Sequence, residues 1–393
     1  MATRKRLAII VSHPIQYYAP LYQRLARRPD VALKVFFTWH SGSCPMRDPG
    51  FNLEIEWDIP LTEGYESELV PNVSPAAGMH HFFGLINPSL IKRVLAWEPD
   101  IVHITGWAWC SHFLAMRDLA KLRVPTLFRG DSHLLDIQNR SGIRWTAKRI
   151  LLKRVFSWPT AFLVVGSANK SYYTAFDVEL DRLLPCTHSI DVNRFSDQSE
   201  MYEFEASEWR KALGVSPDQC VLLFAGKFEK KKCPLELMQA VRNLAKPNVV
   251  LVLVGDGELN GQVRNIAAAE PQMFRVLPFQ NQQRMPVVYR LGDLFVLPSA
   301  HGETWGLATN EALASARPVL VSDRVGCAQE IWDDSCNRIF SWTEPETLSQ
   351  NIAALTQNRE VLVAMRAAAL RKSWSFDISE TEIRVMSAVD SLC

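Results

Sequence analysis

The chain has 393 residues, 48% of them hydrophobic, so it is long enough for two ordinary domains that each bury a core. Its 43 Lys and Arg residues balance 42 Asp and Glu residues, so no overall charge draws it to nucleic acid, and we expect no nucleic-acid partner. The eight cysteines form no CxxC pair, which argues against structural zinc and against a disulfide framework.

The first residues, 1–6, are basic, but the apolar run after them, 7–11, is too short for a signal peptide or a membrane span. We therefore expect a cytoplasmic protein whose thiols stay reduced.

Short β-branched runs alternate with helix-length segments in two series along the chain, which favours parallel sheets covered on both faces. The first series is LAIIV (7–11), VALKVFF (31–37), DIVHIT (100–105), PTLF (125–128) and AFLVVG (161–166). The second series is VLLFAG (221–226), NVVLVLVG (248–255), FRVLPF (274–279), DLFVLPS (293–299) and PVLVSD (318–323). The fold class expected is α/β, with two Rossmann-like, doubly wound domains that face each other across a cleft.

The segment between the two series, 193–218, is polar and acidic and is expected to be a linker with one helix near its end. We place an N-terminal domain at 1–195 and a second domain at 196–375. In open α/β sheets ligands bind at the carboxyl ends of the strands, so the loops after the strands are where function is expected.

The stretch ETWGLATNEA, 303–312, carries two carboxylates eight residues apart, Glu303 and Glu311. On one continuous helix they would lie about 12 Å and roughly 80° apart and could not converge. The pattern instead predicts a strand over 293–299, then a loop that holds Glu303, then a helix that holds Glu311 and ends before Pro318.

This arrangement predicts an anion site at the start of that helix, where the positive end of the helix dipole favours a diphosphate. The backbone N–H groups around the site belong to Thr304, Trp305, Gly306 and Leu307. The two carboxylates are expected to accept hydrogen bonds from hydroxyls, because like charges repel an anion. A sugar diphosphate with a ribose behind it carries hydroxyls on both sides.

At these residues the sequence resembles the family-four retaining glycosyltransferases, which have the glycosyltransferase B (GT-B) fold. The segment 295–332 is similar to the family's Glu-x7-Glu region, and further similar pieces occur in the family's order. They are SIDVNRF (189–195), FAGKFEKKKCPLELMQA (224–240), LVGDGEL (253–259) and LPFQNQ (277–282). The last helix, in 376–393, resembles the family's return crossing to the N-terminal domain.

The resemblance implies a function for each matched residue. Glu303 would bind hydroxyls of the donor sugar, and Glu311 would bind the ribose. Lys227 and Lys232 would hold the diphosphate, Lys227 as a point charge where the family carries a bidentate arginine. The same two lysines also fit a solvated charged run, KFEKKK. In the N-terminal half, SHPIQYYAP (12–20) replaces a glycine-rich turn, so its backbone is not expected to wrap a phosphate as glycine would.

The implied activity is transfer of a hexose, with retention, from a UDP- or GDP-linked sugar to a saccharide, lipid-linked or small-molecule hydroxyl, as in polysaccharide or glycoconjugate biosynthesis. Attack from the front face needs no protein nucleophile and no dedicated metal, and we expect no cofactor besides this co-substrate. Two alternatives stay open: a nucleotide-sugar epimerase of the same fold, and a non-catalytic sugar-phosphate binder.

Related enzymes place an acceptor-side histidine near the end of the strand that PTLF resembles. The expected catalytic set is His133, with Asp131 orienting it or receiving an acceptor hydroxyl, together with Glu303. The other acceptor-side candidates are His13, Gln16, Tyr17, His103, Trp107 and Arg129. His103 fits a core histidine as well as it fits a ligand contact.

A basic segment with aromatic and aliphatic side chains at 140–158 predicts a peripheral contact with an anionic membrane, at its inner face. The basic and apolar sets overlap on a helical wheel, so a solvated helix with one packed stripe fits equally well.

Overall fold

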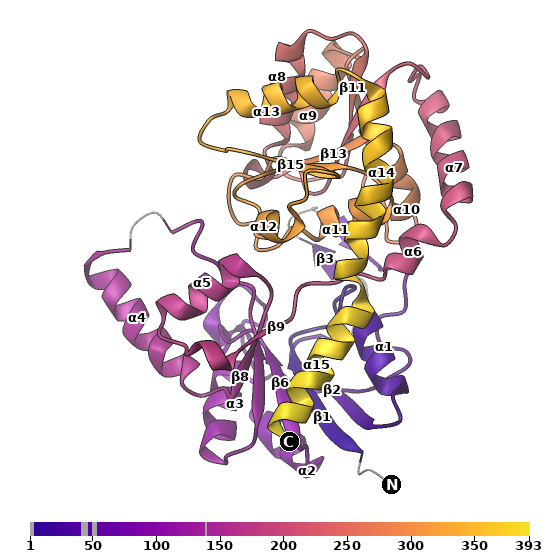
Figure 1. Cartoon of the computed structure of the whole chain (residues 1–393). Coiled ribbons are helices and arrows are strands. Elements are labelled where there is room, and N and C mark those ends of the chain that lie inside the picture. The colour runs from indigo at the N-terminus through magenta and orange to yellow at the C-terminus, as the bar shows by residue number, and fades with distance from the viewer. Residues whose placement is uncertain (1–3, 41–45, 49–52, 138–139) are drawn as a thin grey trace. The chain divides into compact units, whose positions relative to one another are not determined.

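The computed structural model describes residues 4–40, 46–48, 53–137 and 140–393. The chain divides into two compact units. Unit 1 comprises Met1–Pro45, Ile59–His188 and Ile378–Cys393, and unit 2 comprises Met46–Asp58 and Ser189–Asp377. Figure 1 shows both units, with the chain coloured from its N-terminus to its C-terminus.

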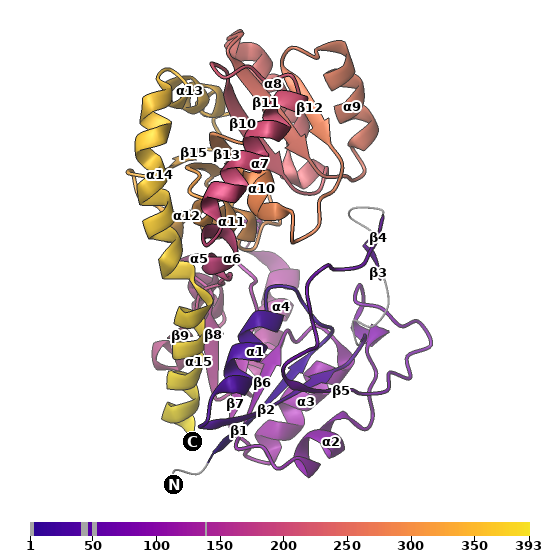
Figure 2. The ribbon, with the colours of Figure 1, turned by 90° about the vertical axis from the view of Figure 1, so that its right-hand side faces the viewer.

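Unit 1 is built on a parallel sheet, which in the described residues has the strand order β5-β2-β1-β6-β7-β8-β9 (Figure 2). Its strands are β1 (Lys5–Val11), β2 (Val31–Phe37), β5 (Glu66–Leu69), β6 (Ile101–Thr105), β7 (Thr126–Arg129), β8 (Ala161–Val164) and β9 (Leu183–Pro185). The central strands are continuous apolar runs because helices bury both of their faces.

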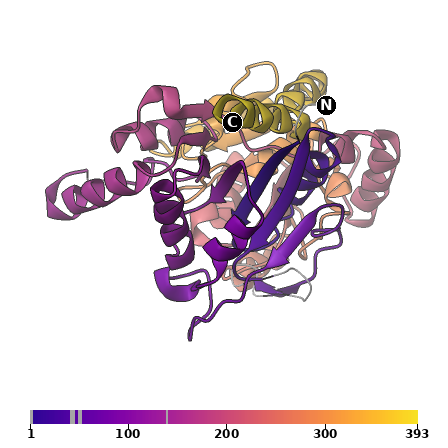
Figure 3. The ribbon, with the colours of Figure 1, turned by 90° about the horizontal axis from the view of Figure 1, so that it is seen from below.

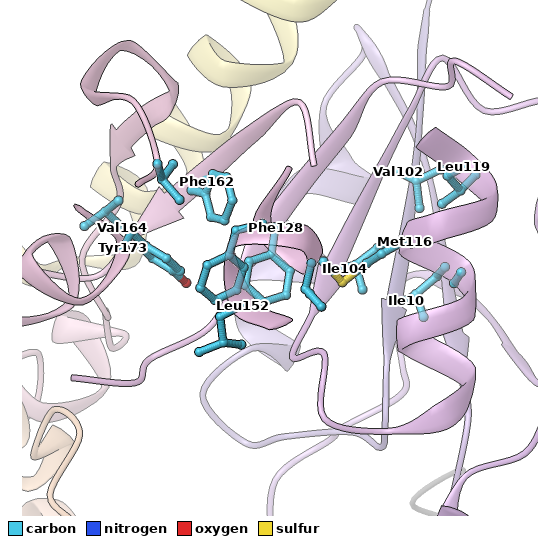
Figure 4. Packing of buried hydrophobic residues seen from close by; sticks show 14 of the residues in the cluster. Ile10, Val102, Ile104, Met116, Leu119, Phe128, Leu152, Phe162, Val164 and Tyr173 are labelled. Carbon is cyan, nitrogen blue, oxygen red and sulfur yellow. The ribbon is translucent and has the colours of Figure 1, made fainter. Parts of the chain in front are cut away.

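The helices of unit 1 form two layers. They are α1 (Ala19–Arg27), α2 (Leu90–Ala96), α3 (Cys110–Lys121), α4 (Gly142–Phe156), α5 (Ser167–Ala175) and α15 (Ile378–Leu392), with short 3-10 turns at Phe82–Gly84 and Leu180–Arg182. Side chains of α2 to α5 pack on one face of the sheet, where Phe128, Leu152, Phe162 and Tyr173 meet (Figure 4). Helices α1 and α15 cover the other face.

Unit 2 has a second parallel sheet, with the order β12-β11-β10-β13-β14-β15 in the described residues. Its strands are β10 (Cys220–Ala225), β11 (Val249–Val254), β12 (Phe274–Leu277), β13 (Leu294–Leu297), β14 (Val319–Ser322) and β15 (Asn337–Phe340). Its helices are α6 (Val192–Ser196), α7 (Ser199–Ala212), α8 (Pro234–Leu244), α9 (Asn260–Ala269), α10 (Met285–Arg290), α11 (Leu307–Ala314), α12 (Ala328–Ile331), α13 (Glu346–Leu355) and α14 (Arg359–Ser373), with 3-10 turns η3 (Lys230–Lys232) and η4 (Trp374–Phe376).

The expectation of a linker at 193–218 is wrong. This segment is folded into unit 2 as α6 and α7, because charged side chains of α7 have buried partners. Glu203 accepts two hydrogen bonds from the fully buried Arg317, at 2.6 and 2.7 Å. Arg210 donates to the buried carboxylate of Asp293, at 2.8 and 3.3 Å. The polar composition of this segment therefore reflects an ion-pair network and not a solvated linker.

The unit boundaries differ from the predicted ones in two respects. The first unit ends at His188 and not at residue 195, since Ile190 bridges to Asp377 and the Val192 backbone N–H donates to the Asp377 carboxylate at 3.2 Å. A hairpin of β3 (Met46–Asp48) and β4 (Leu53–Ile55), absent from the predicted elements, belongs to unit 2. Trp57 beyond it packs against Phe279, with ring centroids 6.5 Å apart.

Candidate functional site

Glu303 lies in the loop between β13 and α11, as predicted. Its Oε2 atom is ion-paired with the ammonium of Lys232, at the end of η3, and accepts a hydrogen bond from the Ser299 hydroxyl at 3.2 Å. Both charged side chains are mostly but not fully buried, with 12% and 20% exposed. The structure thus brings together two of the residues predicted to hold the donor.

The turn before α11 requires glycine at position 306. Gly306 has φ +95°, and a Cβ there would come 2.8 Å from the Cγ1 atom of Val325. Helix α11 starts at Leu307, directly after this turn, and a Cβ at Gly306 would also lie 3.5 Å from the Cγ atom of Glu303. Trp305 is buried, so its side chain packs in the core and only its backbone remains for the predicted anion site. Thr304 is half-buried.

Glu311 lies in the second turn of α11 and is buried, with 3% of its side chain exposed. The Tyr289 hydroxyl of α10 donates to its Oε2 atom at 2.6 Å. Its Oε1 atom lies 3.6 Å from the Arg194 guanidinium and has no hydrogen-bond partner in the described residues. Burial raises the pKa of Glu311, and Arg194 and Tyr289 oppose that rise only in part.

Lys227 follows β10 and is half-buried, in the same connection to α8 that carries Lys232. The backbone around it is fixed, because Gly226 donates to the Val254 carbonyl at 3.0 Å and Phe228 to the Asp256 carbonyl at 2.8 Å. Contact of either lysine with a diphosphate stays a prediction.

In unit 1, His133 lies near Asp136, a carboxylate that was not named from the sequence. It is buried and accepts a hydrogen bond from the Leu135 N–H at Nδ1, 3.2 Å away. Its Nε2 atom lies 3.8 Å from a carboxylate oxygen of Asp136. Asp131 is exposed, and the turn over 134–136 brings Asp136 near the histidine. The position of Asp136 next to His133 was missed because loop geometry is not readable from spacing. A role of Asp131 stays a prediction.

Arg129 ends β7 and is buried, with its guanidinium turned toward the end of β9. It donates to the Cys186 Sγ atom at 3.2 Å and to the Thr187 carbonyl at 3.3 Å. The ring of Tyr18 lies 5.6 Å from the guanidinium carbon. No carboxylate of the described residues lies within ion-pair distance of it, so a buried cation sits at this edge of the sheet without a counter-charge.

His103 lies within β6 and not after it, opposite Ile9 and Leu127 in the sheet. Burial, and then the nearby Arg129, lowers its pKa to about 3, so its ring is neutral at physiological pH. The buried side-chain atoms of unit 1 that lack a hydrogen-bond partner, as far as the structure describes the unit, all lie at β6, β7 or the loop after β7. They are His103 Nε2, Thr105 Oγ1, Arg129 Nε and His133 Nε2.

The remaining acceptor-side candidates lie in loops and are half-buried. His13 follows β1, and its Nδ1 atom is 2.9 Å from the Ser12 hydroxyl. Burial, and then His40, lowers its pKa to about 4. Gln16 and Tyr17 come just before α1, while Trp107 packs against the core of unit 1.

Among the residues that the structure describes, no group of three or more His, Cys, Asp or Glu side chains is arranged to hold a metal ion. A search of the same residues for a helix with the length and hydropathy of a membrane span finds none.

The two parallel sheets, with the candidate donor residues after β10 and β13, define a chain of the GT-B fold with Rossmann-like domains. Solved structures agree over nearly the whole chain. A glycosyltransferase from Rickettsia africae has a TM-score of 0.77 at 12% identity, with 99% of this chain and 98% of that chain covered. Anabaena Alr3699/HepE, solved with UDP and glucose, has a TM-score of 0.72 at 14% identity, with 99% and 100% covered.

The sequence of unit 2 matches a family model. Residues 205–372 match the model of the family described as "Glycosyl transferases group 1". A D-inositol 3-phosphate glycosyltransferase of Xylanimonas cellulosilytica is 27% identical over 208 residues, which are 51% of this chain and 50% of that protein. One of Actinosynnema mirum is 31% identical over 172 residues, 37% and 39% of the two chains. The chain thus spans about half the length, or less, of these curated relatives.

Proposed function

We propose that this protein is a retaining glycosyltransferase that moves a hexose from a UDP- or GDP-linked sugar to a hydroxyl acceptor. The observation that carries the proposal is the pair of carboxylates on either side of the turn at Gly306, one in the loop and one on α11. Glu303 sits beside the Lys232 ammonium at the helix N-terminus, and Glu311 offers a buried acceptor atom one helical turn further on. Anabaena Alr3699/HepE, which has the same fold, has been solved with UDP-glucose, and such a donor has a diphosphate between a sugar and a ribose.

In the proposed reaction, the bond between the anomeric carbon and the diphosphate oxygen breaks. The acceptor oxygen bonds to the same carbon from the same face, and its proton passes to the departing diphosphate. The protein contributes by stabilising the charge that grows on the leaving group. Lys227, Lys232 and the N-terminus of α11 would supply that stabilisation, and Glu303 would hold the sugar hydroxyls. This route uses no resident metal ion, so turnover should persist in EDTA.

For the acceptor we propose the carboxyl end of the sheet in unit 1. His103, Thr105, Arg129 and His133 each present a buried polar atom there without a partner in the described residues. Buried polar atoms are nearly always hydrogen-bonded, so a set of exceptions in one place indicates groups that a ligand completes. His133, beside Asp136, remains the first choice for a contact with the acceptor hydroxyl.

The experiment is a panel of UDP- and GDP-linked sugars, scored first by thermal shift and then by release of the nucleotide. We expect one donor to raise the melting temperature of the wild type and to be hydrolysed slowly, and Glu311→Ala to abolish the shift. If no donor stabilises the protein, the proposal is wrong. Free sugar derived from an unsaturated intermediate would identify an epimerase, and binding without any turnover would identify a non-catalytic binder.

We make a second proposal for helix α4, which is that it contacts an anionic membrane peripherally, at the inner face of the membrane. The helix lies at the edge of unit 1 (Figures 1 and 3). Leu152, Val155 and Phe156 are in the core, while Ile143, Ile150 and Leu151 are 86%, 67% and 47% exposed. Two apolar stripes explain why the helical wheel shows no single hydrophobic face.

The charges of α4 favour an anionic lipid surface. Arg144, Lys148 and Arg154 are exposed, whereas Arg149 and Lys153 bind Asp177, at 2.9 and 3.0 Å. We expect the protein to sediment with vesicles that contain phosphatidylglycerol and not with pure phosphatidylcholine. The double variant Lys148→Glu, Arg154→Glu should lose this binding, and Lys92→Glu on α2 should keep it. Unchanged binding of the double variant would remove the proposal.

A further inference from the structure

Arg194 joins three parts of unit 2 that the proposed donor would touch. It lies on α6, and its Nη2 atom donates to the Gln282 Oε1 atom at 2.8 Å, in the loop after β12. The same nitrogen lies 3.6 Å from the Glu311 Oε1 atom. Its side chain is 25% exposed as a whole.

Both members of the Arg194 and Glu311 pair are incomplete. Glu311 Oε1 is a buried acceptor and Arg194 Nε a buried donor, and neither has a hydrogen-bond partner in the described residues. The Nη2 atom of Arg194 lies 3.6 Å from Glu311 Oε1, which exceeds a hydrogen bond, so the ion pair leaves both Glu311 Oε1 and Arg194 Nε open. One hydroxyl can complete both, because it donates one hydrogen bond and accepts another.

The far sides of both groups are already held. Tyr289 fixes the other oxygen of Glu311 at 2.6 Å, and Gln282 fixes one edge of the guanidinium. The Tyr289 ring is itself packed between Phe195 and Phe295, with centroids 6.1 and 5.5 Å away. Arg194 Nε and Glu311 Oε1 therefore belong to side chains that have little freedom to turn toward other partners.

We propose that Arg194 is a specificity-determining residue that shares one ribose hydroxyl of the donor nucleotide with Glu311. The hydroxyl donates to Glu311 Oε1 and accepts from the guanidinium of Arg194. Gln282 binds the same guanidinium. Arg194 therefore connects the loop after β12 to the ribose contact. This inference rests on the proposed function, and it adds a second protein group to the ribose contact assigned to Glu311.

The test compares a nucleoside diphosphate with its 2′-deoxy and 3′-deoxy analogues by calorimetry, using UDP or, if the donor panel selects it, GDP. We expect the wild type to bind one deoxy analogue at least about tenfold more weakly, the loss typical of an unpaired buried polar group. Arg194→Gln should bring that ratio close to one, and Arg194→Lys should give an intermediate ratio. Tyr289→Phe should weaken all three ligands while keeping the ratio.

The matched control is Arg264→Gln on α9, whose side chain bonds only to Asn260 on its own helix, at 2.9 Å, among the contacts described. It should leave both affinity and ratio unchanged. A wild-type ratio that survives in Arg194→Gln overturns the inference and leaves the proposed function intact. Failure of the wild type to bind either nucleoside diphosphate overturns the proposed function itself. If Arg194→Gln does not fold, the ratio measured on Arg194→Lys decides.

Discussion

The ammonium of Lys232 and the carboxylate of Glu303, 71 residues apart in the sequence, form an ion pair next to the N-terminus of α11. We predict that Lys232→Met lowers kcat about 10²-fold, since one contact to a developing leaving-group charge is worth on the order of a few kcal/mol. Lys232→Arg should retain part of the rate. Steady-state kinetics with the selected donor measures both, and Lys211→Met, which breaks a surface pair with Glu208, is the control. An unchanged kcat in Lys232→Met would exclude the role.

We expect Glu311 to make donor binding dependent on pH. Its pKa is raised by burial, so the carboxylate takes up a proton at a higher pH than an exposed glutamate does. We predict that UDP affinity falls as the pH drops from 8 to 5, and that Glu311→Gln binds weakly with a flatter pH profile. Calorimetry at several pH values on both proteins separates this titration from that of the nucleotide, which is common to both. Parallel profiles would contradict the prediction.

The same shift has the opposite effect on folding. A carboxylate whose pKa is raised in the folded state destabilises that state when it is ionised, so the free energy of unfolding should rise as the pH falls through the folded pKa. At neutral pH, Glu311→Gln should therefore unfold at a urea concentration equal to or above that of the wild type. If Glu311→Gln instead lowers the stability at neutral pH, the surroundings of Glu311 stabilise its ionised carboxylate.

The parallel sheets were predictable because their strands are continuous apolar runs with helix-length spacing. The placement of Glu303 in a loop and Glu311 on a helix was predictable for a similar reason: glycine at 306 and proline at 318 mark where the backbone must turn or stop. Strands β5, β9 and β15 were missed. They lie at sheet edges, where one side is solvated and the apolar signal is weaker.

The side chains that contact Glu311 were not predictable from the sequence. Arg194 and Tyr289 lie 117 and 22 residues before Glu311, and no local spacing connects them to it. Their contacts depend on how α6, α10 and α11 pack together. Asp136 was missed because only the fold of the loop shows that its carboxylate lies near His133.

Ala316 lies two residues after the end of α11 and has a left-handed conformation, with φ 54°. Arg317 N–H donates to the Ala312 carbonyl at 2.9 Å and Ala316 N–H to the Leu313 carbonyl at 2.9 Å, the Schellman pattern in which glycine is preferred. We predict that Ala316→Gly stabilises the protein by about 1 kcal/mol in urea unfolding. Ala314→Gly, inside the helix, should destabilise it. Equal effects of the two changes would contradict this explanation.

Asp293 is the central acid of a buried network in unit 2. Its carboxylate binds Arg210 at 2.8 Å, Arg366 at 3.1 Å and Arg359 at 3.4 Å. Burial acts to raise the pKa of Asp293, but Arg210, the Val221 N–H and Arg359 outweigh it, so the pKa is lowered. We predict that Asp293→Asn costs about 3–5 kcal/mol, because it leaves buried arginines uncompensated. Urea unfolding measures the loss, and Asp334→Asn, at an exposed pair with Arg338, should be near neutral.

The sign of the pH effect follows from that lowered pKa. The stabilisation by Asp293 is present above the pKa of an unfolded aspartate and is lost as the pH falls through the folded value. The wild type should therefore lose stability in acid, and Asp293→Asn should show a smaller loss over the same range. Identical acid sensitivity would mean that other carboxylates dominate.

The hairpin β3–β4 leaves unit 1 between β2 and β5 and is part of unit 2. Residues just beyond it hold the loop after β12: Asn281 donates to the Glu56 carbonyl at 2.6 Å, and the Gln283 N–H to the Asp58 carboxylate at 3.1 Å. That loop also carries Gln282, the partner of Arg194. Exchanging residues 1–188 with those of a relative would thus replace a support of the loop after β12. If that loop and the carboxyl end of the unit 1 sheet bind donor and acceptor as proposed, an exchange at this single junction changes both preferences together.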